Sequence, residues 1–343
     1  MTVDTSKKLM QAAQVTEPNK GFKIGAIERK SPTGNEVMIK VQACGICHSD
    51  SFPHYGGFPG QVYPCVPGHE IVGLVEELGP DVKRFKKGDR VGVGWHGWHC
   101  QVCPNCRSGD FIACEKLLTP GISMSGGYAE YATFSELVCA VVPEKLSSAD
   151  AAPLMCAGVT TFNSLRHAGA QPGDVVAILG VGGLGHLGVQ FANKMGFHTV
   201  AIARGQDKKA MSLELGAHQY IDSESQDVAA ELMKLGGAKV VLATVTSSKA
   251  MSPAVEGLCL GGKLLIVGAG MEPLDVKPVQ LLGARKSIMG WPSGSAKDSE
   301  ECMQFCALTG IRPMLERFPF KDVEKAYERM MSGKARFRAV IEF

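Results

Sequence analysis

Long apolar runs, an excess of charge of one sign and abundant aromatic residues are all missing from this 343-residue sequence. No run of about eighteen consecutive apolar residues occurs, so no membrane-spanning helix is expected. Lys and Arg total 36 against 34 Asp and Glu, and a net charge of +2 excludes the global basic field of a nucleic-acid binder. The first residues carry no apolar segment behind their charges, so we expect no secretory signal and a cytoplasmic protein without membrane partners.

The length suits two domains of roughly 100–200 residues each. Short alternating or apolar runs within 22–45 and 62–94 predict a β-rich first part. After residue 150, strand-like and helix-like segments alternate, which predicts a doubly wound parallel sheet in an α/β protein. The strand-like segments are 174–179, 199–203, 239–243 and 263–267, and the helix-like ones are 149–167 and 185–195. We expect a helix over 322–331 and a strand over 337–343 to return to the first domain, with domain limits of 1–155, 156–295 and 296–343.

Twelve cysteines without a signal peptide indicate thiols kept for packing, metal or catalysis rather than disulfides. Four of them share one short segment with the spacing Cys-x2-Cys-x2-Cys-x7-Cys: Cys100, Cys103, Cys106 and Cys114. Four thiolates close a tetrahedron around Zn²⁺ and leave no open position, so the expected site is structural. An iron–sulfur cluster and a chance group of buried cysteines are the alternatives. The late fourth cysteine, with no proline after it, disfavours the cluster.

A second set of ligand-type residues is dispersed along the chain. Cys47, His69 with Glu70, and Cys156 each stand beside glycines at the end of an expected element. Three protein ligands leave a fourth position open, which is the pattern of catalytic zinc. Ordinary packing is the alternative for each residue, and spacing alone does not bring positions this far apart together.

A glycine-rich loop follows the strand-like segment 174–179 directly and opens a helix. It contains Gly180, Gly182, Gly183, Leu184 and Gly185 in a Gly-x-Gly-x-x-Gly pattern. The three glycines of the pattern permit the turn, the approach of a pyrophosphate and close packing of helix on strand. The loop therefore predicts a dinucleotide site, with an ordinary glycine-rich turn as the alternative.

No acidic residue occurs from Gly185 to Gln206, although an NAD site usually has one about 20 residues past the loop. Arg204, with Lys208 nearby, offers positive charge to a 2′-phosphate instead. We therefore favour NADP over NAD. A solvated arginine, or one stacked on the adenine, is the alternative.

In order along the chain, these motifs resemble those of the zinc-dependent medium-chain alcohol dehydrogenases over almost the full length. Gly68-His69-Glu70 followed by Gly73 and Gly79 looks like the zinc signature of that family. The other motifs stand in the same order along the chain as in the family: residues 45–50 before this signature, and 100–114, 154–161 and 180–185 after it. The His48-Ser49 pair is more similar to the microbial (yeast-type) and cinnamyl-alcohol branches. The resemblance implies a β-rich GroES-like catalytic domain beside a Rossmann domain.

The resemblance also implies roles for individual residues. Cys47, His69 and Cys156 would hold catalytic zinc, with Glu70 as an alternative ligand, and Asp50 would orient the His69 ring. Ser49 would lie against the substrate alcohol and receive its proton. At the cofactor, the residues expected besides the glycine loop, Arg204 and Lys208 are His48, Thr160, Val267 and Arg338. Many relatives have a histidine where this chain has Phe52, so the proton path beyond Ser49 differs.

The implied activity is reversible hydride transfer between a primary alcohol, aromatic and allylic alcohols included, and a nicotinamide cofactor, with two zinc ions per chain. A polyol or secondary-alcohol dehydrogenase and a non-catalytic nucleotide-binding protein are the alternatives. By the same resemblance we expect a homotetramer, with a homodimer as the alternative. Trp95, Trp98, Trp291 and Phe52 are candidates for the walls of the substrate pocket, and ordinary core packing is the alternative for each.

Overall fold

The computed structural model describes residues 8–58 and 61–343, so the expectation about a secretory signal, which falls on residues 1–7, lies outside the described residues. Two compact units form: Met1–Val159 with Gly294–Phe343, and Thr160–Ser293. The limits expected from the sequence, 155/156 and 295/296, lie a few residues from these.

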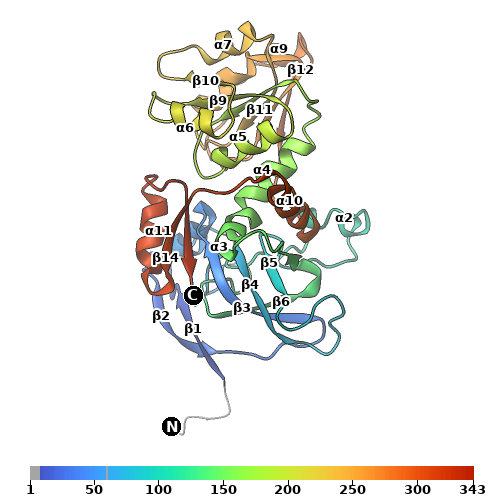
Figure 1. Cartoon of the computed structure of the whole chain (residues 1–343), viewed down its shortest axis with the longest axis vertical. Helices are drawn as coiled ribbons and strands as arrows, with labels where there is room; N and C mark the ends of the chain where they lie inside the picture. The colour runs from blue at the N-terminus through green and yellow to red at the C-terminus, as the bar shows by residue number, and fades with distance from the viewer. Residues whose placement is uncertain (1–7, 59–60) are drawn as a thin grey trace. The chain divides into compact units, whose positions relative to one another are not determined.

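The unit formed by Thr160–Ser293 is built on a six-stranded sheet in which every neighbouring pair is parallel. The strand order is β10-β9-β8-β11-β12-β13, and Figure 1 labels β10, β9, β11 and β12 of this sheet. The strands are β8 (Val175–Leu179), β9 (His198–Ala203), β10 (Gln219–Asp222), β11 (Ala238–Ala243), β12 (Leu258–Ile266) and β13 (Ser287–Gly290). Numbered along the chain this is the order 3-2-1-4-5-6, so the winding direction reverses between β8 and β11.

Helices cover this sheet and explain its nearly continuous apolar strands. Helix α5 (Gly185–Lys194) contacts β8 and β9, α6 (Lys209–Glu214) contacts β10, and α7 (Val228–Lys234) contacts β10 and β12. Helix α4 (Ala157–Arg166) begins three residues before this unit, and α8 (Ser248–Met251) and α9 (Pro278–Leu282) lie within it. Side chains on both faces of the central strands are buried, because a parallel sheet packed between helices has no solvated face.

The other unit is β-rich. Its main sheet has seven strands in the order β14-β15-β3-β4-β5-β7, with β6 also paired to β3, and β1 and β2 form a separate antiparallel ribbon. The strands are β1 (Leu9–Gln14), β2 (Lys23–Glu28), β3 (Glu36–Gly45), β4 (Ile71–Leu78), β5 (Arg90–Val93), β6 (Tyr131–Ser135), β7 (Ala140–Val141), β14 (Leu315–Pro319) and β15 (Arg338–Glu342). The buried core lies under β3, β4 and β6.

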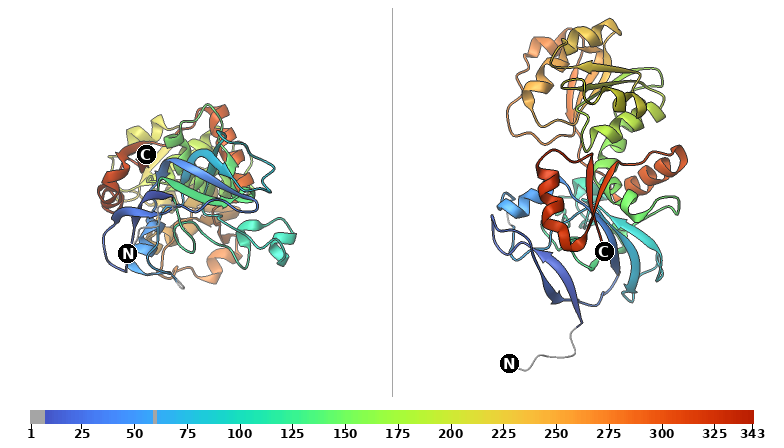
Figure 2. Two further views of the ribbon diagram at one scale, coloured as in Figure 1. Left: turned by 90° about the horizontal axis from the view of Figure 1, so that it is seen from below. Right: turned by 60° about the vertical axis from the view of Figure 1, so that its left-hand side comes forward.

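The C-terminal segment completes this β-rich sheet. Strand β15 pairs antiparallel with β3, placing Val340 opposite Gly45, and α11 (Val323–Met331) packs on β15 (Figure 2). Helix α10 (Ala296–Thr309) begins with a capping box in which Ser295 and Asp298 satisfy each other's backbone N–H groups. In the described ranges no helix is long and apolar enough to cross a membrane.

The helix expected over 149–167 is interrupted. Ser147 caps α3 (Ser148–Ala151), a 3-10 turn spans Ala152–Met155, and α4 resumes at Ala157. Pro153 lacks the amide proton that an α-helix needs, and Cys156 adopts φ −131° and ψ −75°, outside the helical region. A cysteine therefore stands in the break between two helices. The β-rich unit also contains the short helices α1 (Ser51–Tyr55) and α2 (Pro104–Arg107).

Candidate functional site

Three segments that are distant in sequence bring one predicted ligand set together within the β-rich unit. Cys47, His69, Glu70 and Cys156 each present one ligand atom, and these atoms lie within 4.8 Å of one another. Cys47 follows β3 and precedes the 3-10 turn His48–Asp50, His69 and Glu70 immediately precede β4, and Cys156 stands in the break before α4. The fold thus brings together the ligand-type residues whose proximity the sequence spacing alone did not predict.

The His69 ring offers one nitrogen to this cluster. His69 is fully buried, and its Nδ1 lies 3.1 Å from Asp50 Oδ1. Its Nε2 has no hydrogen-bond partner among the described residues, although buried polar atoms are normally paired. Burial opposes a charge on the ring, but the Asp50 carboxylate raises the pKa of His69 well above its usual range. Surroundings that favour a proton on this ring also favour a metal cation at Nε2.

The two thiols of the cluster are spaced like ligands of one ion. The Sγ atoms of Cys47 and Cys156 lie 3.9 Å apart. Two sulfurs at about 2.3 Å from a tetrahedral zinc would lie about 3.8 Å from each other. The hydrogen bond from Cys156 lowers the pKa of the Cys47 thiol well below its usual range, and the same contact raises the pKa of Cys156. Two thiol donors at this spacing, together with the imidazole nitrogen, fit a tetrahedral zinc.

Glu70, one of the four residues of the cluster, forms a buried ion pair with Arg338. Glu70 is fully buried, and its Oε1 accepts a hydrogen bond from Arg338, which also donates to the Ile46 carbonyl at 3.0 Å. A Cβ on Gly45 would lie 1.9 Å from Glu70 Oε2, so only glycine leaves room for this carboxylate. Burial raises the pKa of Glu70 to about 7, while Arg338 acts in the opposite direction. The implied role of Arg338 at a cofactor stays a prediction.

The four-cysteine segment forms a second compact cluster. The sulfurs of Cys100, Cys103, Cys106 and Cys114 lie within 4.8 Å of one another, and α2 begins between the second and third of them. Backbone N–H groups point at the sulfurs: that of Cys103 lies 3.3 Å from Cys100 Sγ, and that of Cys100 lies 3.3 Å from Cys114 Sγ. Hydrogen bonds from backbone N–H groups lower the pKa of Cys103 to about 6. Four thiols with no open position fit a structural zinc.

The glycine loop joins β8 to α5 at the carboxyl edge of the parallel sheet. Gly180 has φ +97°, a conformation that favours glycine, and a Cβ on Gly185 would lie 1.7 Å from the Gly180 carbonyl oxygen. A Cβ on Gly182 would meet nothing within 4 Å, so the loop is open there. The first and last glycines thus serve the turn and the packing, and the middle one faces open space, as the predicted phosphate site requires.

Arg204 follows β9 at the same edge. Its side chain is exposed, and Lys208 donates to the Val181 carbonyl of the glycine loop at 2.7 Å. The backbone after Arg204 is fixed by Asp222, whose carboxylate accepts hydrogen bonds from the Gly205 N–H and the Gln206 side chain. Lys208 therefore contacts the predicted phosphate loop, and Arg204 lies at the same edge of the sheet.

The other implied residues occupy several places. Ser49 is half-buried, and its hydroxyl lies 3.9 Å from Cys47 Sγ, whereas His48 is exposed in the same turn. Thr160 is buried on α4. Val267 directly follows β12 and donates to the Ala243 carbonyl at the carboxyl end of β11, so it lies at the same sheet edge as the glycine loop.

One of the aromatic candidates, Trp95, contacts the ligand set directly. The Trp95 ring is edge-on to His69, with ring centroids 5.2 Å apart. Trp98 is 37% exposed, and Trp291 stacks on a histidine of the parallel-sheet unit. Phe52 packs beside Phe58, with ring centroids 6.0 Å apart.

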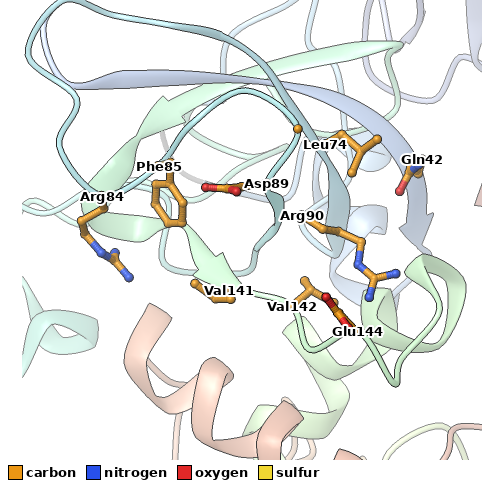
Figure 3. A pocket seen from close by; sticks show the side chains of 10 residues that line it. Gln42, Leu74, Arg84, Phe85, Asp89, Arg90, Val141, Val142 and Glu144 are labelled. Carbon is orange, nitrogen blue, oxygen red and sulfur yellow. The ribbon is translucent and has the colours of Figure 1, made fainter.

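A cavity of about 660 Å³ in the β-rich unit does not contain these ligands. Its charged lining consists of Arg84, Asp89, Arg90 and Glu144 (Figure 3). Both arginines already donate to backbone carbonyls. Their balanced charges give this hollow no defined ligand chemistry.

Three supporting residues escaped the sequence reasoning. Thr244 donates to the Gly180 carbonyl at 2.8 Å and supports the glycine loop. Asp222 fixes the loop after β9, and the Tyr128 hydroxyl donates to Asp50 Oδ2 at 2.9 Å. Only Tyr128 carried a signal, because it follows the glycine pair 126–127, which indicates close backbone contact.

Comparison with known proteins agrees with this geometry. Residues 33–144 match the family model of the alcohol dehydrogenase GroES-like domain, and residues 183–308 match that of the zinc-binding dehydrogenases. An alcohol dehydrogenase of Penicillium expansum is 41% identical over 337 residues, which cover 98% of each chain.

Two solved structures show the same fold over 98% of both chains. A cinnamyl alcohol dehydrogenase of Sorghum bicolor has a TM-score of 0.88 at 30% identity. The protein described as CAD from Helicobacter pylori, in complex with NADP(H), has a TM-score of 0.86 at 28% identity.

The predicted combination of a Rossmann sheet with a GroES-like domain is confirmed by the strand order, both family models and these structures. The Penicillium expansum relative is 41% identical over 98% of this chain and 98% of its own length. Identity at this level shows a shared family as well as a shared fold. The chain belongs to the zinc-type medium-chain alcohol dehydrogenases and is an oxidoreductase of the alcohol dehydrogenase class.

Proposed function

We propose that the protein interconverts primary alcohols and aldehydes with a nicotinamide cofactor at a zinc site formed by Cys47, His69 and Cys156. The observation that carries this proposal is the convergence of two thiols and an unpartnered imidazole nitrogen, with donor atoms within 4.8 Å. Zinc supplies Lewis acidity that lowers the pKa of an alcohol, and the nicotinamide supplies the hydride acceptor. Glu70 is the alternative fourth ligand.

The residues around the ligand set divide the remaining work. Asp50 holds the His69 ring through Nδ1, so that Nε2 faces the thiols. Ser49, beside Cys47, accepts the alcohol proton. Phe52 carries no titratable group, so a proton on Ser49 would not pass to the side chain at position 52. Trp95 forms an apolar wall next to His69.

For the cofactor we propose NADP(H) with residual use of NAD(H). Support comes from the open glycine loop, the exposed Arg204 and Lys208 at 2.7 Å from the loop. The Helicobacter pylori relative is described in complex with NADP(H). A Cβ on Gly205 would lie 3.6 Å from the carboxylate of Glu224, and this negative charge opposes a phosphate. We therefore expect a preference for NADP(H) rather than exclusion of NAD(H).

A second zinc ion is proposed for Cys100, Cys103, Cys106 and Cys114, where it contributes to folding. We further propose a homotetramer assembled through the parallel sheets, with a homodimer as the alternative. Strand β13 is the outermost strand of its sheet, and exposed apolar side chains lie on the neighbouring elements β12 and α9. They are Leu260, Val279 and Leu282.

The experiment that tests the activity is a panel of initial rates. Primary, secondary, polyol and aromatic alcohols, and the matching aldehydes, are assayed with NADP(H) and NAD(H). We expect the highest kcat/KM for a primary alcohol or its aldehyde with NADP(H). Turnover confined to polyols or secondary alcohols contradicts the proposed substrate class, and no turnover with any pair contradicts the proposed reaction.

A further inference from the structure

The loop that carries His69 is held by a neighbouring segment, Gly126–Tyr128. The Gly126 N–H donates to the Val66 carbonyl at 2.7 Å, and the Gly127 N–H donates to the Gly68 carbonyl at 2.9 Å. The Tyr128 N–H donates to the Pro67 carbonyl at 2.9 Å. Three consecutive backbone bonds therefore fix the residues directly before His69.

This contact leaves no room for a side chain at its glycine positions. A Cβ on Gly126 would lie 2.3 Å from the Gly68 carbonyl oxygen, and one on Gly127 would lie 2.4 Å from Ile71 Cγ1. Gly68 has φ +98°, and a Cβ there would lie 2.5 Å from the Tyr128 ring. The Tyr128 ring thus packs directly on the backbone of the residue that precedes the ligand.

The Tyr128 hydroxyl then reaches the carboxylate that connects two ligands. Tyr128 is fully buried and donates to Asp50 Oδ2 at 2.9 Å. The same oxygen accepts the Cys47 N–H at 2.8 Å, and the other oxygen lies 3.1 Å from His69 Nδ1. One carboxylate therefore joins the ring of one ligand to the backbone of another, and Tyr128 limits its rotation.

We propose that Tyr128 is a positioning residue of the catalytic metal site: its hydroxyl fixes Asp50 and thereby aims His69 Nε2 and Cys47 at the metal. This inference rests on the proposed zinc site. Partners of metal ligands typically contribute 10–100-fold in metal affinity or activity. Tyr128 does not contact a ligand side chain through its hydroxyl but hydrogen-bonds to Asp50, which contacts His69. We therefore expect a smaller effect, about three- to tenfold.

The test is Tyr128→Phe, which removes the hydroxyl and keeps the ring. Zinc release from the holoenzyme to a colorimetric chelator is followed, and the four-cysteine zinc serves as an internal reference. One zinc should leave about three- to tenfold faster, with the other unchanged. Tyr327→Phe is the matched control, because its buried hydroxyl does not hydrogen-bond to Asp50 although its ring packs on the same Phe22. It should release zinc at wild-type rates.

The variant Asp50→Asn separates positioning from packing. If Tyr128 acts through Asp50, Tyr128→Phe should add less than about a twofold effect in the Asp50→Asn background. Wild-type release rates in Tyr128→Phe overturn the inference. So do an equal acceleration of both zinc ions and effects of the two substitutions that multiply independently. A wild-type protein without zinc overturns the proposed function itself, whereas normal zinc with no effect of Tyr128→Phe overturns only this inference.

Discussion

Arg204 is the residue on which the proposed preference for NADP(H) depends most. It is exposed directly after β9, where an acid would pair with the ribose hydroxyls of NAD. A guanidinium instead matches a phosphate with a planar set of donors. A charge-assisted hydrogen bond contributes about 1.5–3 kcal/mol. Because solvent screens an exposed pair, we expect the lower end, about a tenfold preference.

Arg204→Asp should reverse this preference. The carboxylate would repel a 2′-phosphate and accept hydrogen bonds from the ribose hydroxyls. We expect kcat/KM with NADP(H) to fall about tenfold or more and that with NAD(H) to rise. The measurement is the ratio of the two kcat/KM values. A wild-type enzyme that works better with NAD(H) contradicts the role given to Arg204.

Asp222 makes the stability of the loop after β9 depend on pH. Its carboxylate accepts hydrogen bonds from the backbone of Glu224, the side chains of Ser225 and Gln206, and the backbone of Gly205, and these hold its pKa at about 2. Since the pKa is lower in the folded state, the stabilisation is present above about pH 4 and is lost as the pH falls toward 2.

Asp222→Asn should therefore lower the melting temperature most near neutral pH. The difference from wild type should shrink between pH 4 and the acid limit of folding, because the wild-type carboxylate becomes protonated there. Thermal unfolding of both proteins across this range is the measurement. A difference that stays constant with pH would show that the hydrogen bonds do not depend on the charge.

At the scale of elements, the sequence predicts regular segments better than their interruptions. Apolar strand runs and the glycine loop locate β8, β9, β11 and α5, because burial on both faces leaves a simple pattern. The break at Cys156 was not predicted, since the apolar residues 154–159 suit a helix equally well. The convergence of Cys47, His69 and Cys156 depends on tertiary packing and was predictable only through resemblance. Tyr128 and Asp222 act across 78 and 17 residues, a separation over which periodicity carries no information.

The four-cysteine segment, with its short helix α2, should depend on its metal. Cys103→Ser removes one of four thiolates and should release the zinc of this cluster. We expect the melting temperature to fall by roughly 5 °C or more, because a closed site contributes to folding. Cys259→Ser is the control, since this cysteine lies outside both ligand groups. A Cys103→Ser protein with full zinc and wild-type stability contradicts a structural metal.

At the scale of the whole molecule, the exposed edge of the parallel sheet argues for self-association. Apolar side chains such as Val279 and Leu282 are 69% and 74% exposed on α9, next to the outermost strands. Light scattering should give four times the chain mass of 36.5 kDa, or twice that mass for the alternative dimer. A species of 36.5 kDa alone contradicts both.

The most direct test of the account is the zinc content of the wild-type protein and of Cys47→Ser, measured by elemental analysis beside turnover. The account predicts two zinc ions per wild-type chain. It predicts one zinc ion per Cys47→Ser chain, with turnover lost and the fold retained, because the four-cysteine site does not include Cys47. An active wild-type protein without zinc, or a Cys47→Ser variant that keeps both zinc ions and full turnover, would contradict the account.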